Sequence, residues 1–279
     1  MPIVPCFDPD TGASGGPSSG GGPAPGPGAH EWVPELTLDL ETATPVAQVT
    51  ASGSNQTISH VMGAVTLDAN FKAWSSNNAT YEITANGGEL AGQNAASSTS
   101  TLAYKLTPLL ASLGYEWLCK YPVAVQVLVK NWQQTHADDG IYFGLNNNTY
   151  THNSGKFRGV YTYQDSVDPA VEKRYIRNTG SNTATTDGVS NTNGQGRLLT
   201  LILHGGDFVE VQEVNNVSAF ADPSTDFRDV ATYMQCGSWG LARNTTLTVY
   251  TADLSVIVSC VRQTSMYVSA IRLLRWKAP

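Results

Sequence analysis

The chain has 279 residues, of which 14% are charged, and its 16 Lys and Arg against 23 Asp and Glu give a net charge of -7. This length suffices for a sizeable core in one large domain or two smaller ones. Phosphate binding needs clustered basic side chains, and no Lys or Arg precedes Lys72, so we expect no nucleic-acid partner.

The N-terminus predicts neither a secretory signal nor a membrane span. Met1–Cys6 has no basic residue and no long apolar run. The cysteines, Cys6, Cys119, Cys236 and Cys260, are widely spaced without a CxxC pair. We expect buried reduced thiols and no cofactor, with a zinc site or a disulfide framework as the alternatives.

Residues 1–35 are predicted to form an extended arm rich in Gly, Pro and Ser. The arm carries too few apolar side chains to offset the entropy lost on ordering. Its tip is apolar, and we expect the arm to bind a partner there or to fold back onto its own domain. The predicted anchor residues are Pro2, Ile3, Val4, Pro5 and Phe7.

Residues 36–279 are predicted to form one β domain. Short alternating or apolar runs predict strands at 36–40, 46–50, 61–67, 81–84 and 101–106, and a single helical turn is expected at 108–113, before Gly114. Further strands are expected at 122–130, 141–145 and 157–163, and the polar stretch 178–196 is expected to be an exposed loop.

A β-hairpin is the clearest element of the sequence. Runs 198–203 and 208–214 flank a His-Gly-Gly-Asp turn, whose glycines reach positive φ without steric cost. The first run is apolar on both faces and predicts a central strand, whereas Glu210 and Gln212 alternate with valines and predict one wet face.

The C-terminal part continues the β pattern. A loop is expected at 221–228, and strands are expected at 247–250, 254–258 and 266–276, the last one apolar on both faces and enclosed by the fold. Many short strands separated by Gly- and Asn-rich turns predict an all-β antiparallel sandwich after the arm.

The order of strands from Tyr121 resembles the concanavalin A-like or laminin-G-like jelly roll. The similar stretches are YPVAVQVLVKNW, DDGIYFGLNNNTY, RLLTLILHGGDFVEVQEVNN, LTVYTADLSVIVS and MYVSAIRLLRW. The resemblance implies the fold, and a family that includes sugar-binding lectins, calcium-binding modules and glycoside hydrolases.

Each of these activities has candidate residues. Hydrolases of this fold pair carboxylates on one strand face. Glu210 and Glu213 are three residues apart and fall on opposite faces, so we expect both to be solvent-face or hairpin-end carboxylates.

Calcium candidates are Asp138, Asp139 and Asn146, although no EF-hand spacing is present. Glycan-binding candidates are Trp132, Tyr142, Tyr150 and Trp239.

No catalytic motif is present. The histidines at 30, 60, 136, 152 and 204 show no metal-binding spacing, and GxSxG and phosphate loops are missing. We therefore expect no enzyme.

The predicted function is that of a virion structural protein, a phage capsid decoration, cement or fibre-associated subunit held by its arm. It would assemble in the host cytoplasm as a homo-oligomer on other virion subunits. The alternative is a carbohydrate-binding module for host-surface glycans, and a polysaccharide-degrading enzyme ranks last.

Overall fold

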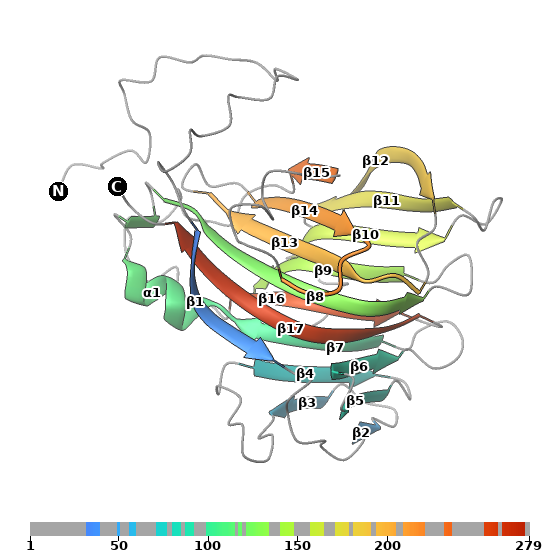
Figure 1. Ribbon diagram of the computed structural model, residues 1–279, viewed down its shortest axis with the longest axis horizontal. Helices are drawn as coiled ribbons and strands as arrows, with labels where there is room; N and C mark the ends of the chain where they lie inside the picture. The colour runs from blue at the N-terminus through green and yellow to red at the C-terminus, as the bar shows by residue number, and fades with distance from the viewer. Residues whose placement is uncertain are drawn as a thin grey trace.

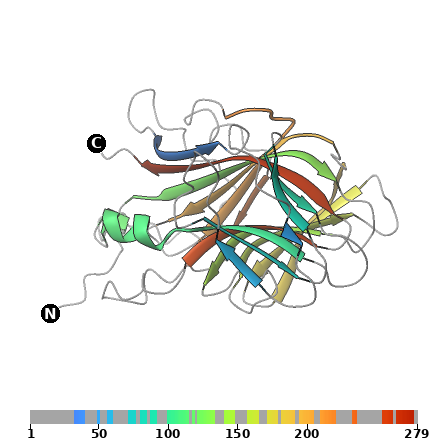
Figure 2. The same ribbon diagram turned by 90° about the horizontal axis from the view of Figure 1, so that it is seen from below.

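A computed structural model describes residues 32–39, 49–50, 56–59, 71–76, 80–84, 87–91, 99–114, 117–118, 121–133, 140–147, 157–164, 171–178, 181–190, 194–204, 209–220, 232–235, 254–261 and 264–276. These residues form two antiparallel β-sheets stacked as layers, with one short helix among them (Figures 1 and 2). The predicted all-β antiparallel sandwich is confirmed.

The first sheet, sheet A, holds most of the long strands. Its spatial order is β15 (Thr232–Gln235), β14 (Val209–Asn215), β13 (Arg197–Leu203), β8 (Val123–Gln133), β17 (Ser265–Trp276), β6 (Gly87–Ala91), β5 (Thr80–Thr84) and β2 (Val49–Thr50), and β1 (Trp32–Asp39) also pairs with β17.

The second sheet, sheet B, lies behind it. Its order is β12 (Ser181–Ser190), β11 (Val171–Asn178), β10 (Arg158–Gln164), β9 (Gly140–Asn147), β16 (Leu254–Val261), β7 (Thr99–Lys105), β4 (Phe71–Ser76) and β3 (Gln56–Ser59). The helix α1 (Thr107–Leu113) follows β7 and ends at Gly114, whose φ of 79° suits glycine, as predicted.

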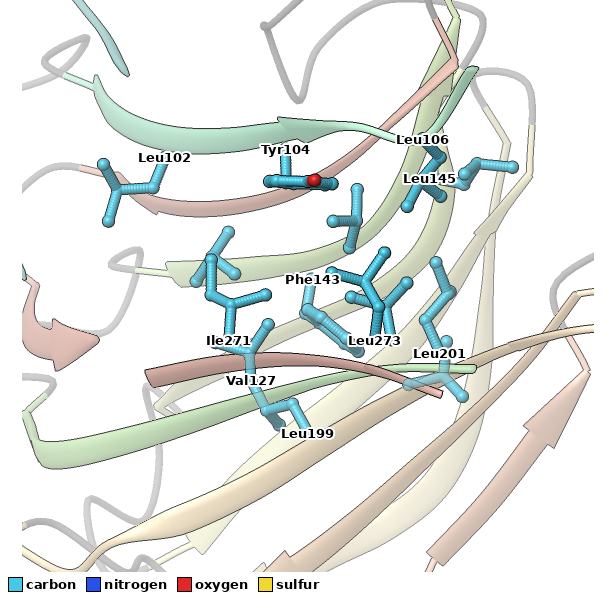
Figure 3. Close-up of a cluster of buried hydrophobic side chains, with 14 of the residues drawn as sticks. Leu102, Tyr104, Leu106, Val127, Phe143, Leu145, Leu199, Leu201, Ile271 and Leu273 are labelled. Carbon is cyan, nitrogen blue, oxygen red and sulfur yellow. The ribbon is translucent and has the colours of Figure 1, made fainter. Parts of the chain in front are cut away.

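One apolar cluster fills the space between the sheets (Figure 3). Sheet A contributes alternate residues of its central strands, because successive side chains of a strand point to opposite faces. The register sets Val125 beside Leu201 and Val127 beside Leu199, and Phe143 of sheet B belongs to the same cluster. Full burial of each such side chain contributes roughly 1.5–3 kcal/mol.

The predicted hairpin is confirmed, and one of its details is wrong. β13 and β14 pair from Arg197–Asn215 to Leu203–Val209, and β13 lies between β8 and β14, as a central strand should. The turn residues 205–208 lie outside the described residues. Glu210 and Gln212 are only 6% and 7% exposed, because β15 extends the sheet beyond β14 and the two side chains bond each other.

The loop expected over 178–196 is wrong for its central part. Ser181–Ser190 forms β12, which pairs with β11 at the edge of sheet B. Its threonines favour extended backbone, and an edge strand held by backbone hydrogen bonds needs no apolar alternation. The sequence therefore lacked the signal on which the prediction relied.

The remaining expectations differ in outcome: one strand is confirmed, several observed strands were not predicted, and some expected segments are not described. The terminal strand is confirmed as β17, which is enclosed by β8 on one side and by β1 and β6 on the other. Strands β3, β4, β6, β11 and β15 were not predicted. The expectations for 61–67, 221–228 and 247–250 lie outside the described residues.

Two glycines allow β9 and β10 to approach closely. Gly144 and Gly159 are cross-strand partners. A Cβ on Gly144 would lie 2.3 Å from the Arg158 carbonyl oxygen and 2.6 Å from the Gly159 Cα. Both obstacles are backbone atoms, so a side chain at this position requires the strands to separate.

We predict that Gly144→Ala lowers the free energy of unfolding by roughly 1–3 kcal/mol, because the added methyl group overpacks this contact. Urea denaturation measures the change. Ser112→Ala is the control, since it removes only an exposed hydroxyl that donates to the Leu109 carbonyl and should change stability by less than about 0.5 kcal/mol. Equal stability of Gly144→Ala and the native chain would contradict the close approach.

Cys260 of β16 is a buried free thiol within the apolar cluster. Burial raises the pKa of the Cys260 thiol well above its ordinary value, and a hydrogen bond with Thr264 lowers it by less. The raised pKa means that the folded chain holds the thiol proton more tightly than the unfolded chain does. Its contribution to stability is therefore full below the unfolded thiol pKa, about 8.5, and is lost as the pH rises above it.

We predict that Cys260 resists alkylation by iodoacetamide at pH 8 in the folded protein and reacts after unfolding in guanidinium. Mass spectrometry of the Cys260 peptide distinguishes this thiol from the other cysteines. Rapid alkylation under native conditions would show that β16 is not enclosed as described.

Candidate functional site

The outer face of sheet A, opposite the apolar cluster, carries a row of polar side chains. Gln126 of β8 is the cross-strand partner of Arg272 on β17 and of Thr200 on β13, and Thr200 is in turn the partner of Gln212 on β14. The four residues therefore cross four adjacent strands in register. We call them, together with Glu210 and His204, the polar row.

Hydrogen bonds join one half of the polar row. Arg272 donates from Nε to Gln126 Oε1 over 2.8 Å, and its Nη2 donates to the same oxygen. Gln126 then donates from Nε2 to Thr200 Oγ1 over 3.3 Å. The three side chains are each 5% exposed or less, so the guanidinium charge is satisfied inside the sheet face and not by solvent.

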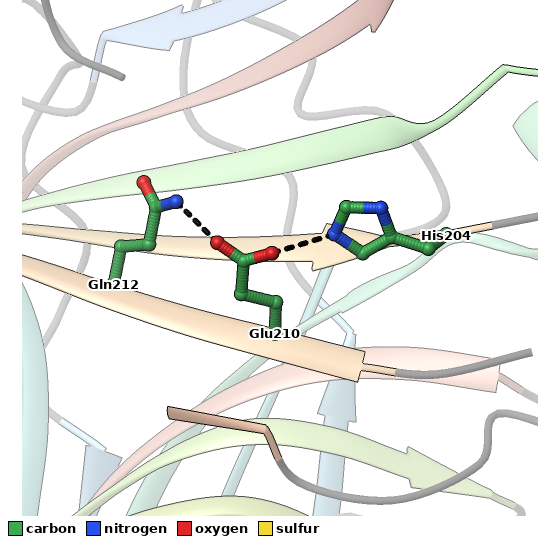
Figure 4. Close-up of polar contacts among 3 residues, drawn as sticks. All are labelled: His204, Glu210 and Gln212. Atoms are coloured by element: carbon green, nitrogen blue, oxygen red, sulfur yellow. Dashed lines mark hydrogen bonds and ion pairs between the residues drawn. The ribbon is translucent and has the colours of Figure 1, made fainter. Parts of the chain in front are cut away.

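The other half of the row is centred on a carboxylate (Figure 4). Gln212 donates from Nε2 to Glu210 Oε1, and His204 Nε2 lies 2.7 Å from Glu210 Oε2. An ionised carboxylate only accepts, so His204 donates from Nε2. The His204 side chain is 26% exposed and that of Glu210 is 8% exposed, so solvent reaches this end of the row.

A coil covers the arginine end of the row. In Figure 1 the chain after β14 turns back across β13 and β8. Val217 donates its backbone N–H to the Gly196 carbonyl over 3.2 Å, and the Phe220 ring centroid lies 4.3 Å from the Arg272 guanidinium carbon. A guanidinium over an aromatic face is electrostatically favourable, and this contact screens the cation from ligands.

An apolar patch flanks the row. Trp32 of β1 and Trp276 of β17 meet edge to face with ring centroids 5.0 Å apart, beside Leu274, Ala124 and Ile202. The outer face of sheet A thus combines a short polar row with an aromatic border.

Glu213 lies on the opposite face from Glu210, as predicted. It pairs with Arg197 at 3.0 Å, and both side chains are at most 2% exposed. The expectation that both glutamates are solvent-face or hairpin-end carboxylates is wrong, since each is buried and bonded to a partner across or beside the strand. Arg197–Glu213 links β13 to β14, which is a structural role.

Glu35 and Asp39 of sheet A lie too far from Glu210 to form a carboxylate pair of the glycosidase kind with it. Glu35 and Asp39 both lie on β1, four strands from Glu210. Four strand spacings amount to about 19 Å along the sheet, whereas glycosidases hold their two carboxyl groups about 5–10 Å apart. Neither Glu35 nor Asp39 can therefore act together with Glu210 on one glycosidic bond.

Of the predicted glycan-binding residues, Tyr142 lies away from this row. Tyr142 lies on β9 of sheet B, where its ring stacks on Tyr161 with centroids 4.2 Å apart. Trp132 belongs to β8 of sheet A, and Tyr150 and Trp239 lie outside the described residues. Their role stays a prediction.

Of the calcium candidates, the structure describes Asn146. Asn146 is fully buried on β9, while Asp138 and Asp139 lie outside the described residues. No cluster of three or more His, Cys, Asp or Glu side chains suited to a metal occurs within the described part of the chain.

The arm residues Pro2, Ile3, Val4, Pro5 and Phe7 lie outside the described residues, so their binding to other virion subunits stays a prediction. In the ranges that the structure describes, no helix is both long and apolar enough to span a membrane.

Sequence reasoning missed the polar row. It expected Glu210 and Gln212 to be solvated, and it assigned Gln126 and Arg272 to no site. The usable signal was a polar residue inside the apolar runs of β8, β13 and β17, at Gln126, Thr200 and Arg272. Combining these residues required the strand order and register, which the sequence does not contain.

We predict energetic coupling within the row. Gln126→Leu removes the acceptor that two Arg272 N–H groups share and should cost roughly 1.5–3 kcal/mol, whereas Gln126→Leu combined with Arg272→Met should cost less than the sum of the single changes, by about 0.5–3 kcal/mol. Urea denaturation of the three variants measures this cycle. Additive costs would contradict the coupling.

No known protein family matches the chain, and no curated protein matches it either. Solved structures share only its general architecture. A protein of unknown function from Shewanella oneidensis MR-1 is 11% identical over 88% of this chain and 93% of its own, with a TM-score of 0.48. The lectin UEA-II complexed with galactose is 10% identical over 88% and 99%, with a TM-score of 0.43. A legume lectin-like domain from Entamoeba histolytica is 10% identical over 73% and 89%, with a TM-score of 0.42.

Proposed function

We propose that this domain binds carbohydrate on the outer face of sheet A, at the Glu210–His204 end of the polar row. The observation that carries the proposal is the row itself, a set of hydrogen-bonded donors and acceptors on the sheet face opposite the core. The proposal rests on this geometry, because the lectin-like structures are too distant to carry it.

The chemistry of the row suits a polyhydroxylated ligand. Binding sites commonly combine apolar surface with a few oriented polar groups. Here Glu210 offers acceptor oxygens and is held by hydrogen bonds with Gln212 and with the partly exposed His204. Trp32 and Trp276 supply aromatic surface at the border of the same face.

The charge distribution argues against a polyanionic ligand. The chain carries a net charge of -7, and the cation within the row, Arg272, is engaged by Gln126 and covered by Phe220. Electrostatic attraction of phosphate-rich partners needs exposed clustered cations.

A glycan array probed with the full chain tests the proposal. We predict binding to at least one oligosaccharide, and a loss of about 10- to 100-fold in affinity in Glu210→Ala, the range expected for hydrogen bonds to a charged group. Thermal melting should verify that the variant folds.

Ser112→Ala is the matched control, because Ser112 is exposed on α1, a helix that packs against the apolar cluster between the sheets and not on the polar row. It should bind like the native chain. Absence of binding to every glycan, or binding that Glu210→Ala leaves unchanged, would contradict the proposed site.

A further inference from the structure

A buried apolar row lies beside the polar row on the outer face of sheet A. Leu274 of β17, Ala124 of β8 and Ile202 of β13 are neighbours in register. Ile202 is also the cross-strand partner of Glu210 on β14. The three apolar side chains are at most 3% exposed, so a ligand does not reach them, but their register places the residues that follow in the same strands.

The next row on this face is partly exposed. Trp276, Pro122 and His204 each lie two residues from a member of the apolar row, toward the same end of the sheet, so their side chains point to the same outer face. The Trp276 backbone N–H donates to the Pro122 carbonyl over 3.3 Å. His204 follows the Leu203–Val123 pair, which sets it next to Pro122. All three residues are partly exposed, and we call them the exposed row.

The two ends of the exposed row differ in chemistry. At one end the Trp276 ring meets Trp32 edge to face, with centroids 5.0 Å apart, and supplies aromatic surface. At the other end His204, whose side chain is 26% exposed, is bonded to Glu210 over 2.7 Å and supplies polar surface. A sugar chain carries both hydroxyl groups and apolar C–H faces, so it matches a surface that is polar at one end and aromatic at the other.

The separation of the two ends sets the length of the ligand. Trp276 and His204 extend from β17 and β13, which lie on either side of β8. Two strand spacings amount to about 10 Å. A pyranose ring is about as wide as one strand spacing, so a monosaccharide at the Glu210–His204 end leaves Trp276 uncovered. A chain of sugars laid across the strands reaches both ends.

We propose that the carbohydrate site continues along the exposed row from His204 to Trp276, so that it takes an oligosaccharide and packs one of its sugars on the Trp276 ring. This inference rests on the proposed function, and it adds the length of the ligand and a second contact residue. Both contact residues are partly exposed, so the ligand meets them at the surface of the sheet.

The test is isothermal titration of the full chain with the oligosaccharide that binds best on the glycan array and with its truncated forms, down to the monosaccharide. We expect the longest form to bind at least about tenfold more tightly than the monosaccharide, because only the longer forms reach the Trp276 ring. Trp276→Leu should remove this gain and leave the affinity for the monosaccharide unchanged within about twofold.

Two further variants serve as controls. Trp276→Phe keeps a smaller aromatic ring and should retain part of the gain, so it tests the contact even if Trp276→Leu fails to fold. Tyr161→Leu removes a partly exposed ring from another aromatic pair, since Tyr161 stacks on Tyr142 of sheet B with centroids 4.2 Å apart. It should keep the full gain. Thermal melting shows which variants fold.

The outcomes separate the two proposals. If no glycan binds, the proposed function is wrong and the inference falls with it. If glycans bind through Glu210 and the monosaccharide binds as tightly as the longest form, the extended site is wrong while the proposed function stands. The same conclusion follows if affinity increases with length and folded Trp276 variants keep the full gain.

Discussion

The arrangement of the outer face of sheet A depends on two opposite charges placed within an otherwise apolar sheet surface. Arg272 and Glu210 are three strands apart and both are almost fully buried. A buried charge is tolerated only where partners replace water, and each of these charges is given a glutamine amide. Gln126 and Thr200 continue the hydrogen bonds from Arg272, Gln212 and His204 surround Glu210, and polar residues thus occupy every strand between the two charges.

This arrangement also explains why the two glutamates of β14 differ in role. Glu213 faces the interior and is bonded to Arg197 of the neighbouring strand, so it fixes the hairpin. Glu210 faces the other way and is bonded to His204, which is partly exposed. Successive side chains of a strand point to opposite faces of the sheet. This alternation places the structural carboxylate of Glu213 on one face of β14 and the carboxylate of Glu210, which we propose contacts a ligand, on the other.

Much of the fold could be predicted because apolar alternation is a local signal. The valines of β8 and the apolar runs of β13 and β17 gave their strands correctly, and glycine at 114 marked the end of the helix. Two features were beyond that signal. The Thr- and Asn-rich β12 pairs through its backbone at a sheet edge, and the burial of Gln212 depends on β15, a strand some twenty residues later in the chain. Predicting the polar row requires both the strand order and the register, which the sequence does not contain. Its residues could therefore be recognised only individually.

The claim that this face of sheet A binds carbohydrate can be measured at the atoms involved. Side-chain amide NMR signals of Gln126 and Gln212, assigned through Gln126→Leu and Gln212→Met, should be followed during titration with a sugar that the chain binds. The account predicts that the Gln212 amide signal shifts in a saturable manner, with a smaller change at Gln126. Saturable backbone shifts confined to sheet B, with both amide signals unmoved, would contradict it.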